Sequence, residues 1–454
     1  MATSTINKRE MILNEPIFKT IISLSVPLMF GNLAQTLYNL ADAYWVGNKI
    51  GSEGFAAIGY VWPITFIFLA FSIGLGIAAT SLISQSVGDE DYTKANRILG
   101  QYFIVTILLG IFFSIIGFFL TPTIIKLMGA TGNLYTMSVD YLQIIFLELP
   151  ILFSFQVYRS MRESQGDTIS PTIIIVISVI INVVLDPIFI VTLGLGIKGA
   201  ALATVLSKIL VVWYLYLRMI DKSSKVHLSL ETLKPDMPVL KNLLSIALPS
   251  TAGQTISAFG FTLMNAAIIS YGVETVAAFG LGNRITNLFM MPAFAISGAL
   301  SAFIGQNIGA KQFDRAKASV KIAISFSFGL LVTGSILIYF IKEPIILFFI
   351  KDSKEVFDLS VNYMNILCFV FPLMAIFQGF LGVFSGSGHT KYTLYLTLSR
   401  LWLLRLPMIY IFSTYTSYGS DGIWYAMLIS NLIVSFIGFI IIRRGKWLTP
   451  TLRI

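Results

Sequence analysis

Long apolar segments, separated by short polar ones, run along the whole chain. Twelve of them are long enough to cross a bilayer, since a spanning helix needs about 20 mostly apolar residues. Their expected bounds are 16–46, 54–84, 96–120, 136–160, 168–192, 197–218, 238–269, 275–305, 316–341, 357–384, 392–414 and 420–442. The pattern therefore predicts an all-α polytopic membrane protein with twelve transmembrane helices.

A polar stripe interrupts the first apolar segment. Gln35, Tyr38, Asn39 and Asp42 are spaced i, i+3, i+4 and i+7, so they share one face of a helix. A carboxylate at membrane depth costs about 2.5–3.5 kcal/mol on insertion scales, and helices that carry one usually face a cavity or a partner. We therefore expect Gln35, Tyr38 and Asn39 to line a substrate cavity and Asp42 to be functional. The alternative is that Asp42 reaches interfacial water at the helix end and has no function.

The two halves of the chain repeat. A shift of 222 residues places Pro27 and Gly31 on Pro249 and Gly253, and further matches follow in the same order. Six spans per copy is an even number, so the copies should be related by a pseudo-twofold axis along the membrane normal, as in many transporters. The expected domains are an N-terminal lobe (1–218), a cytoplasmic linker (219–237) and a C-terminal lobe (238–454).

The composition fits a membrane protein and indicates its orientation. Of 454 residues, 56% are hydrophobic and 12% are charged, whereas a soluble domain carries about 25% charged residues. Lys and Arg number 21 in the segments on the side of the amino terminus and 6 in the opposite connections, which makes both termini cytoplasmic. The net charge of +9 is then an orientation signal and does not indicate a nucleic-acid partner.

Few residues could support catalysis or bind a metal. Cys368 is the single cysteine, and the two histidines fall outside the expected spans. The chain therefore has no internal disulfide and no metal-ligand cluster, and a membrane-embedded enzyme is disfavoured. We expect no cofactor beyond a coupling ion. A passive channel is also disfavoured, because an internal duplication suits alternating access.

Acids at membrane depth occur in the first half only, and they are Asp42, Glu148 and Asp186. Glu148 either lines the cavity or is paired with a basic group. Asp186, in the fifth span, should lie at about the level of Asp42, and Asn182 shares its helix face one turn earlier. Tyr141 and Thr204 reach a similar level from the fourth and sixth spans. In the second half, the position that matches Asp42 is a methionine. A cation-binding site should therefore belong to the first lobe alone.

Two carboxylates at one level suit a coupling ion. Burial and mutual repulsion disfavour two negative charges, so such a pair can take up a proton on one side of the membrane and release it on the other. Oxygen ligands also suit a hard cation such as Na⁺. The residue types leave H⁺ and Na⁺ open, and a Na⁺ ion would use Asp42, Asp186, Asn182 and Thr204.

Several motifs together resemble the MATE family, multidrug and toxic compound extrusion. They are Glu15-Pro-Ile, Ser25-Val-Pro27, Leu37-Tyr-Asn-Leu-Ala-Asp42 with Trp45-Val-Gly47, Ser84-Gln-Ser-Val-Gly88, Gly166-Asp-Thr168, and Asn182 to Asp186-Pro187. The similarity covers essentially the whole chain and looks closest to the prokaryotic DinF-like branch. The second-lobe acids of the NorM-like branch have no counterpart here.

The resemblance implies a secondary active exporter of amphipathic organic cations, driven by inward H⁺ or Na⁺ movement across the plasma membrane of a prokaryote. It also implies that Asp42 and Asp186 are the cation site, with three supporting ligands: Tyr141, Asn182 and Thr204. A cavity with aromatic and methionine surface and one carboxylate would suit a flat lipophilic cation. We expect a monomer whose further contacts are with membrane lipids.

Two interpretations stay open. Pro27 lies in the middle of the first span, where it is either a static bend or a hinge that shrinks the first-lobe cavity. A flippase for lipid-linked saccharides would have the same architecture and would need a basic cavity for a pyrophosphate. Arg284, Arg400 and Arg405 lie at membrane depth and support that alternative, unless they pair with helix carbonyls or lipid headgroups.

Overall fold

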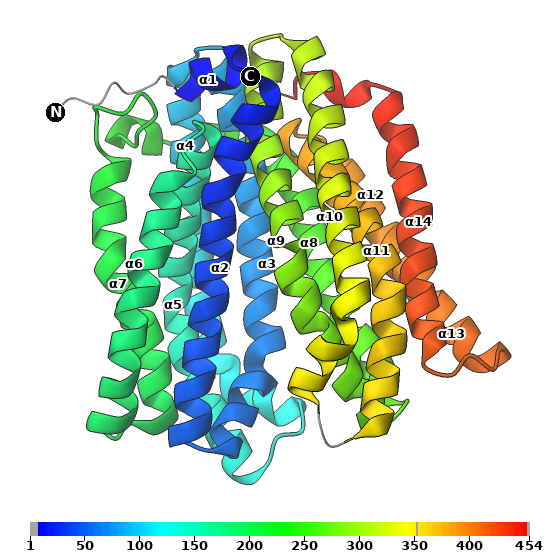
Figure 1. Ribbon diagram of the computed structural model, residues 1–454. Helices are drawn as coiled ribbons and strands as arrows, with labels where there is room; N and C mark the ends of the chain where they lie inside the picture. Colours follow the sequence, from blue (N-terminus) through cyan, green and yellow to red (C-terminus); the bar gives the residue numbers. More distant parts are fainter. Residues whose placement is uncertain (1–7, 351–352, 452–454) are drawn as a thin grey trace. The chain divides into compact units, whose positions relative to one another are not determined.

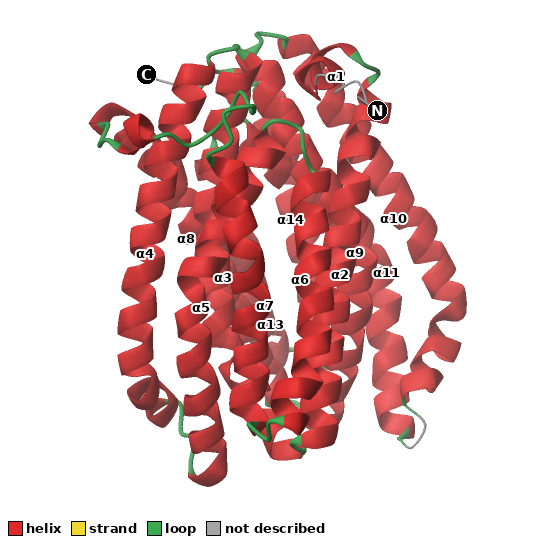
Figure 2. Cartoon of the chain, turned by 90° about the vertical axis from the view of Figure 1, so that its left-hand side faces the viewer, coloured by secondary structure: helices red, strands yellow, loops and turns green. Residues whose placement is uncertain are grey.

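The computed structural model describes residues 8–350 and 353–451, which form two compact units (Figure 1). The N-unit comprises residues 30–251. The C-unit comprises the described residues 8–29 and 252–451. Helices connected by loops and turns make up both units, and no strand occurs in the described ranges (Figure 2). The all-α prediction is confirmed.

The N-unit is built around one central helix. Helix α5 (Gly132–Ser164) packs against α3 (Ser52–Gly88), α4 (Tyr92–Leu127) and α7 (Gly196–Met219). The remaining elements are most of α2 (Ile17–Lys49), α6 (Ile169–Pro187), the π-helical turn η1 (Ile188–Thr192) and the 3₁₀ turn η2 (Leu230–Leu233).

The C-unit repeats this packing order. Helix α11 (Lys354–Gly386) contacts α9 (Val273–Gly309), α10 (Phe313–Phe349) and α14 (Asp421–Arg443), as α5 contacts α3, α4 and α7. The other elements are α1 (Lys8–Asn14), most of α8 (Met237–Ile269), α12 (Thr390–Leu398), the π-helical turn η3 (Ser399–Arg405), α13 (Leu406–Tyr415) and the 3₁₀ turn η4 (Lys446–Leu448). The two halves of the chain therefore pack their corresponding helices in the same way, as the sequence repeat predicts.

In the part of the chain that the structure describes, twelve helical segments are long and apolar enough to cross a membrane, as predicted. Their ends differ from the expected ones mainly by extension: α4 begins at Tyr92 and α10 ends at Phe349, several residues beyond the apolar stretches. A helix continues past the hydrocarbon wherever its polar groups are satisfied. Lys342 illustrates this, because its ammonium donates to the carbonyl of Tyr339 at 3.1 Å and lies 3.6 Å from the centre of that ring.

Two helices contribute to both units. Helix α2 passes from the C-unit to the N-unit after Met29, and α8 passes from the N-unit to the C-unit after Thr251. Pro27 and Pro249 each lie two residues before these points. The units are defined by packing, whereas the expected lobes 1–218 and 238–454 are defined by the repeat, and that division stays a prediction.

Side-chain contacts fix the shared segment of α2 to the C-unit. Ile21, Leu24 and Leu28 are buried in a core with residues of α9, α10 and α11. Arg315 of α10 donates to the carbonyl of Ile12 at 2.9 Å and also to that of Glu15, which ties the α1–α2 elbow to the same unit.

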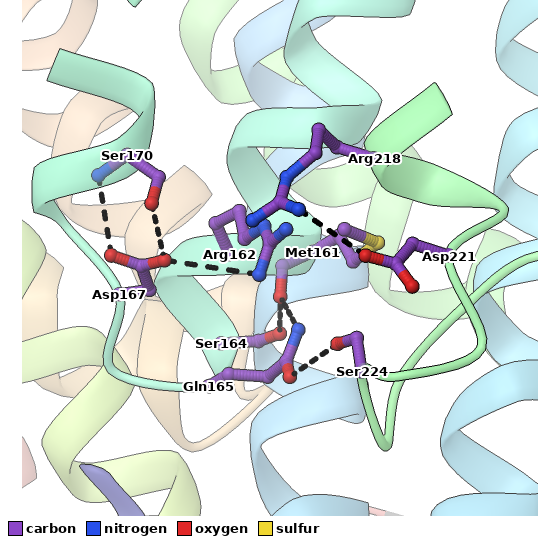
Figure 3. Close-up of polar contacts among 9 residues, drawn as sticks. All are labelled: Met161, Arg162, Ser164, Gln165, Asp167, Ser170, Arg218, Asp221 and Ser224. Carbon is purple, nitrogen blue, oxygen red and sulfur yellow. Dashed lines mark hydrogen bonds and ion pairs between the residues drawn. The ribbon is translucent and has the colours of Figure 1, made fainter. Parts of the chain in front are cut away.

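A cluster of polar side chains joins the turn between α5 and α6 to the start of the linker after α7 (Figure 3). Asp167 accepts hydrogen bonds from the backbone of Ser170 at 3.2 Å and from its hydroxyl at 2.6 Å, which fixes the α5–α6 turn. Arg218 forms an ion pair with Asp221 at 3.2 Å. The backbone N–H of Ser223 also donates to Asp221 and holds the pKa of this carboxyl below its usual value.

Candidate cation site and substrate cavity

The two predicted carboxylates are buried in the N-unit. Asp186 is fully buried at the end of α6, next to Pro187 and the π-helical turn η1, and Asp42 of α2 is 8% exposed. Their charges are close enough to interact. A π-helical turn beside a buried acid is notable, because such turns are frequent at functional sites.

Three oxygens of this pair and its neighbour are left unpaired. Asn182 donates from Nδ2 to Oδ1 of Asp186 at 3.2 Å. Oδ1 of Asp42, Oδ2 of Asp186 and Oδ1 of Asn182 are buried and have no hydrogen-bond partner among the described residues. Buried polar atoms are nearly always satisfied in folded proteins. These acceptors therefore provide a place where a proton or a small cation would find its ligands.

The remaining predicted ligands surround the carboxylates from other helices. Tyr141 of α5 is buried and lies in electrostatic range of both Asp42 and Asp186. Thr204 of α7 is also buried, and its hydroxyl is 2.8 Å from the hydroxyl of Tyr38. The structure thus brings the five predicted residues into one buried region, with Thr204 bonded to a phenol and not to a carboxylate.

A cavity of about 410 Å³ lies within the N-unit. Gln35, Tyr38 and Asn39 line it, as do residues of α3, α5, α6 and α7. Its aromatic wall consists of Trp62, Phe66, Phe68, Phe146 and Phe155. The expected methionine surface is wrong, since the described lining residues include no methionine; branched aliphatic side chains from α5 and α6 take that place.

The carboxylates and the cavity are distinct sets of residues. Asp42 and Asp186 are not among the lining residues, whereas Tyr38 and Thr204 line the cavity and are also bonded to each other. Tyr38 lies in electrostatic range of Asp42. Lys208, which lines the cavity as well, is also in electrostatic range of Asp42. Tyr38, with its bond to Thr204, and Lys208 are therefore parts of the cavity wall that lie near the carboxylates.

The acid that does line the cavity is Glu148, and it is paired. Lys208 of α7 donates to its carboxylate and lies 5.9 Å from the ring centre of Tyr38. The side chain of Glu148 is 7% exposed and that of Lys208 is 28% exposed. The sequence left open whether Glu148 lines the cavity or pairs with a basic group, and it does both. Its partner Lys208 was not predicted, although opposite charges in the fourth and sixth expected spans were a signal for it.

The second-half arginines differ in their surroundings. Arg284 is exposed on α9, whereas Arg400 and Arg405 are 7% and 3% exposed. Pairing with helix carbonyls, one of the roles that the sequence leaves open for these arginines, is not seen for Arg400 or Arg405 among the described residues. The Nε of Arg405 donates to the hydroxyl of Ser430 at 3.1 Å, and the Nε of Arg400 has no partner.

Comparison with known proteins identifies the same repeat. A family model described as MatE matches residues 27–188 and 249–411. The chain is 28% identical over 414 residues to the probable multidrug resistance protein YoeA of Bacillus subtilis (strain 168), covering 88% of each chain. It is 27% identical over 444 residues to a protein of Shewanella oneidensis named FAD transporter, covering 96% of each.

Solved structures match over nearly the full length. One is described as "Crystal structure of MATE in complex with MaL6", with a TM-score of 0.91 and 27% identity over 97% of this chain and 98% of that one. Another is described as "Crystal structure of MATE in the bent conformation", with a TM-score of 0.91 and 26% identity over 98% of each.

Proposed function

This chain belongs to the MatE family of transporters, and we propose that it is a secondary active multidrug exporter that exchanges amphipathic organic cations for H⁺ or Na⁺ by alternating access. Family membership and twelve apolar helices make it an integral multi-pass membrane protein and a transporter, not an enzyme. The observation that carries the proposal is the trio of unpaired, buried oxygens on Asp42, Asn182 and Asp186.

The cavity supports the substrate class. Its wall is mainly aromatic and aliphatic, which suits burial of a flat apolar ring system, and aromatic faces attract cations. Its polar groups include the Tyr38–Thr204 contact, several amides and hydroxyls, and the Glu148–Lys208 pair. Arg159 also lines it and is paired with Glu163 at 2.6 Å. An organic cation placed there would be stabilised by the negative charge of Asp42, which interacts with Tyr38.

Exchange follows from reciprocal linkage. If the drug binds better when the Asp42–Asp186 pair is negatively charged, then loading a proton or Na⁺ on the pair lowers drug affinity by the same factor by which the drug lowers ion affinity. Ion entry from outside would thus expel the drug, and drug entry from inside would expel the ion. Asp42, Asp186, Asn182, Thr204 and Tyr141 are the proposed cation-coupling residues.

Features of helix α2 support the proposal that it moves during transport. Pro27 removes one backbone donor inside the helix, and the packing of α2 changes units just after it, at Met29. We infer that α2 bends at Pro27 and that the bend changes the N-unit cavity, since Gly31, Gln35 and Tyr38 on the far side of the proline line it. The orientation proposed for this cycle keeps both termini cytoplasmic, in the plasma membrane of a prokaryote, with a monomer as the working unit.

The test is ethidium efflux from everted membrane vesicles with pH and Na⁺ gradients imposed separately. Efflux driven by one of the two gradients establishes the exporter and identifies its ion. A chain that is well inserted but moves no ethidium and no other lipophilic cation under either gradient would overturn the proposal.

A lipid-linked saccharide flippase is the second candidate. The buried Arg400 and Arg405, for which no ion pair is found among the described residues, favour it, because a pyrophosphate needs basic partners. A relative named FAD transporter would likewise handle a pyrophosphate-containing molecule. Transfer of a fluorescent lipid-linked saccharide between leaflets of proteoliposomes, with no ethidium efflux, would favour this candidate.

A further inference from the structure

The C-unit holds two arginines at the middle of a membrane span. Arg400 lies ten residues after Thr390, where the span begins, and Arg405 lies ten residues before Tyr415, where it ends. At 1.5 Å per residue the 26 residues of the span cover about 39 Å, so its midpoint falls between the two arginines and each lies about 4 Å from it, well inside a hydrocarbon core of about 30 Å. Substrate sites of transporters lie near this level.

The π-helical turn η3 places both arginines on one face. In an α-helix, residues i and i+5 point about 140° apart, because each residue turns the helix by about 100°. In a π-helix the i→i+5 hydrogen bond stacks residue i+5 on residue i. The turn spans Ser399–Arg405, so Arg400 and Arg405 are neighbours on the buried side, while Leu403 between them is exposed.

Protein groups satisfy these guanidinium groups only in part. Arg400 stacks over the ring of Phe377, 4.1 Å from its centre, and its Nε has no hydrogen-bond partner. Arg405 donates one hydrogen bond, to Ser430. No ion pair joins either arginine to an acid in the ranges that the structure describes. A guanidinium carries five N–H donors, so most of this donor capacity is unused.

A further donor and a buried aromatic stack lie beside them. The hydroxyl of Tyr363 is buried without a partner and lies in electrostatic range of Arg405. The Tyr363 ring stacks on Trp424 with 4.0 Å between centres, and Phe279 stacks on the same indole. Uncompensated positive charge in the membrane interior is strongly unfavourable, and it is kept where a counter-charge binds.

We propose that Arg400 and Arg405 bind the phosphate group of an amphipathic organic phosphate within the C-unit. Two planar guanidinium groups match the oxygens of a phosphate by paired hydrogen bonds, and the buried hydroxyl of Tyr363 is a further donor near Arg405. This site is separate from the cation site, because Asp42, Asp186 and the cavity all belong to the N-unit. Such a phosphate can come from a lipid headgroup or from a soluble aromatic phosphate.

The test compares probes that differ by one phosphate. Purified protein in phosphatidylcholine nanodiscs is titrated with flavin mononucleotide and with riboflavin, following flavin fluorescence. Flavin mononucleotide should bind at least about tenfold more tightly than riboflavin, since charge-assisted hydrogen bonds carry the difference. Nanodiscs that contain phosphatidylglycerol identify the source: competition with the flavin and a higher melting temperature indicate a lipid headgroup.

Three variants locate the site. Arg400→Gln and Arg405→Gln should each remove the phosphate-dependent difference, and Arg400→Lys should retain part of it because one charge remains without the planar fork. Arg284→Gln is the matched control, since this arginine is exposed in the same unit, and it should leave flavin binding unchanged. Arg400→Gln should also melt at a higher temperature than the parent in phosphatidylcholine alone, because an unpaired buried charge is gone.

Two results would overturn the proposal. One is equal binding of the two flavins together with no effect of phosphatidylglycerol on melting. The other is undiminished flavin mononucleotide binding by a monodisperse Arg400→Gln or Arg400→Lys protein. Neither result depends on ethidium export, so failure here is distinct from failure of the proposed antiport.

Discussion

The Glu148–Lys208 pair gives the sharpest stability prediction, because its two members differ in exposure. Replacing Lys208 with Met leaves Glu148 charged in a site where its side chain is 7% exposed. Replacing Glu148 with Gln leaves Lys208, whose side chain is 28% exposed and can turn toward water or the ring of Tyr38. The two single variants should therefore not be equivalent.

The magnitude follows from burial. Breaking a fully buried pair costs about 3–5 kcal/mol, and an exposed pair contributes about 0–1 kcal/mol. With Glu148 buried and Lys208 partly exposed, we expect Lys208→Met to cost about 2–3 kcal/mol and Glu148→Gln about 1 kcal/mol. The double variant should recover most of the loss, since two neutral side chains leave no uncompensated charge.

The assay is a double-mutant cycle on unfolding in mixed detergent micelles, followed by far-ultraviolet circular dichroism. Ethidium binding supplies a second readout: Lys208→Met leaves the Glu148 carboxylate in the cavity wall without its counter-charge and should raise ethidium affinity severalfold. The reasoning is refuted if Lys208→Met is no more costly than Glu148→Gln, or if the double variant is less stable than both single ones.

Two further predictions concern packing and the cavity wall. Gly382→Leu should cost about 1–3 kcal/mol of unfolding free energy by overpacking, since even a Cβ atom there would lie 2.6 Å from the carbonyl oxygen of Ser297. Gly280→Ala, with nothing within 4 Å of its added Cβ, is the control, and equal costs would contradict the close α9–α11 packing. Tyr38→Phe removes the 2.8 Å contact to Thr204 and should lower ethidium efflux severalfold without a matching loss of stability; unchanged efflux in vesicles would show that this contact does not link cavity and carboxylates.

The fold was predictable because membrane spans are encoded locally. Apolar length alone located twelve spans, and the shift of 222 residues predicted that both halves pack alike. The ends of the helices were less predictable. For example, α10 continues past Lys342 to Phe349 because this charged residue is buried within the helix. The π-helical turns were not predicted either, because no residue type signals an i→i+5 bond; each lies next to a proline, Pro187 before the first and Pro407 after the second, which supplies no backbone N–H.

The site residues were predictable where their presence in a membrane span costs free energy. Carboxylates within apolar segments drew attention to Asp42 and Asp186, and helical spacing placed Asn182 beside the latter. Spacing within one helix says nothing about which helices touch. For that reason the Glu148–Lys208 pair and the separation of the carboxylates from the cavity needed three-dimensional packing.

The central claim is that the Asp42–Asp186 pair couples ion and drug binding. The most direct measurement is the ethidium affinity of the purified protein as a function of pH and of Na⁺ concentration, for the parent, Asp42→Asn and Asp140→Asn. Asp140 of α5 serves as control. Its side chain is 29% exposed, forms an ion pair with Lys198 at 3.3 Å, and is not among the residues that line the cavity. The account predicts that affinity falls as H⁺ or Na⁺ rises in the parent and in Asp140→Asn, and that Asp42→Asn binds weakly with no such dependence. The same ion dependence in Asp42→Asn as in the parent would contradict it.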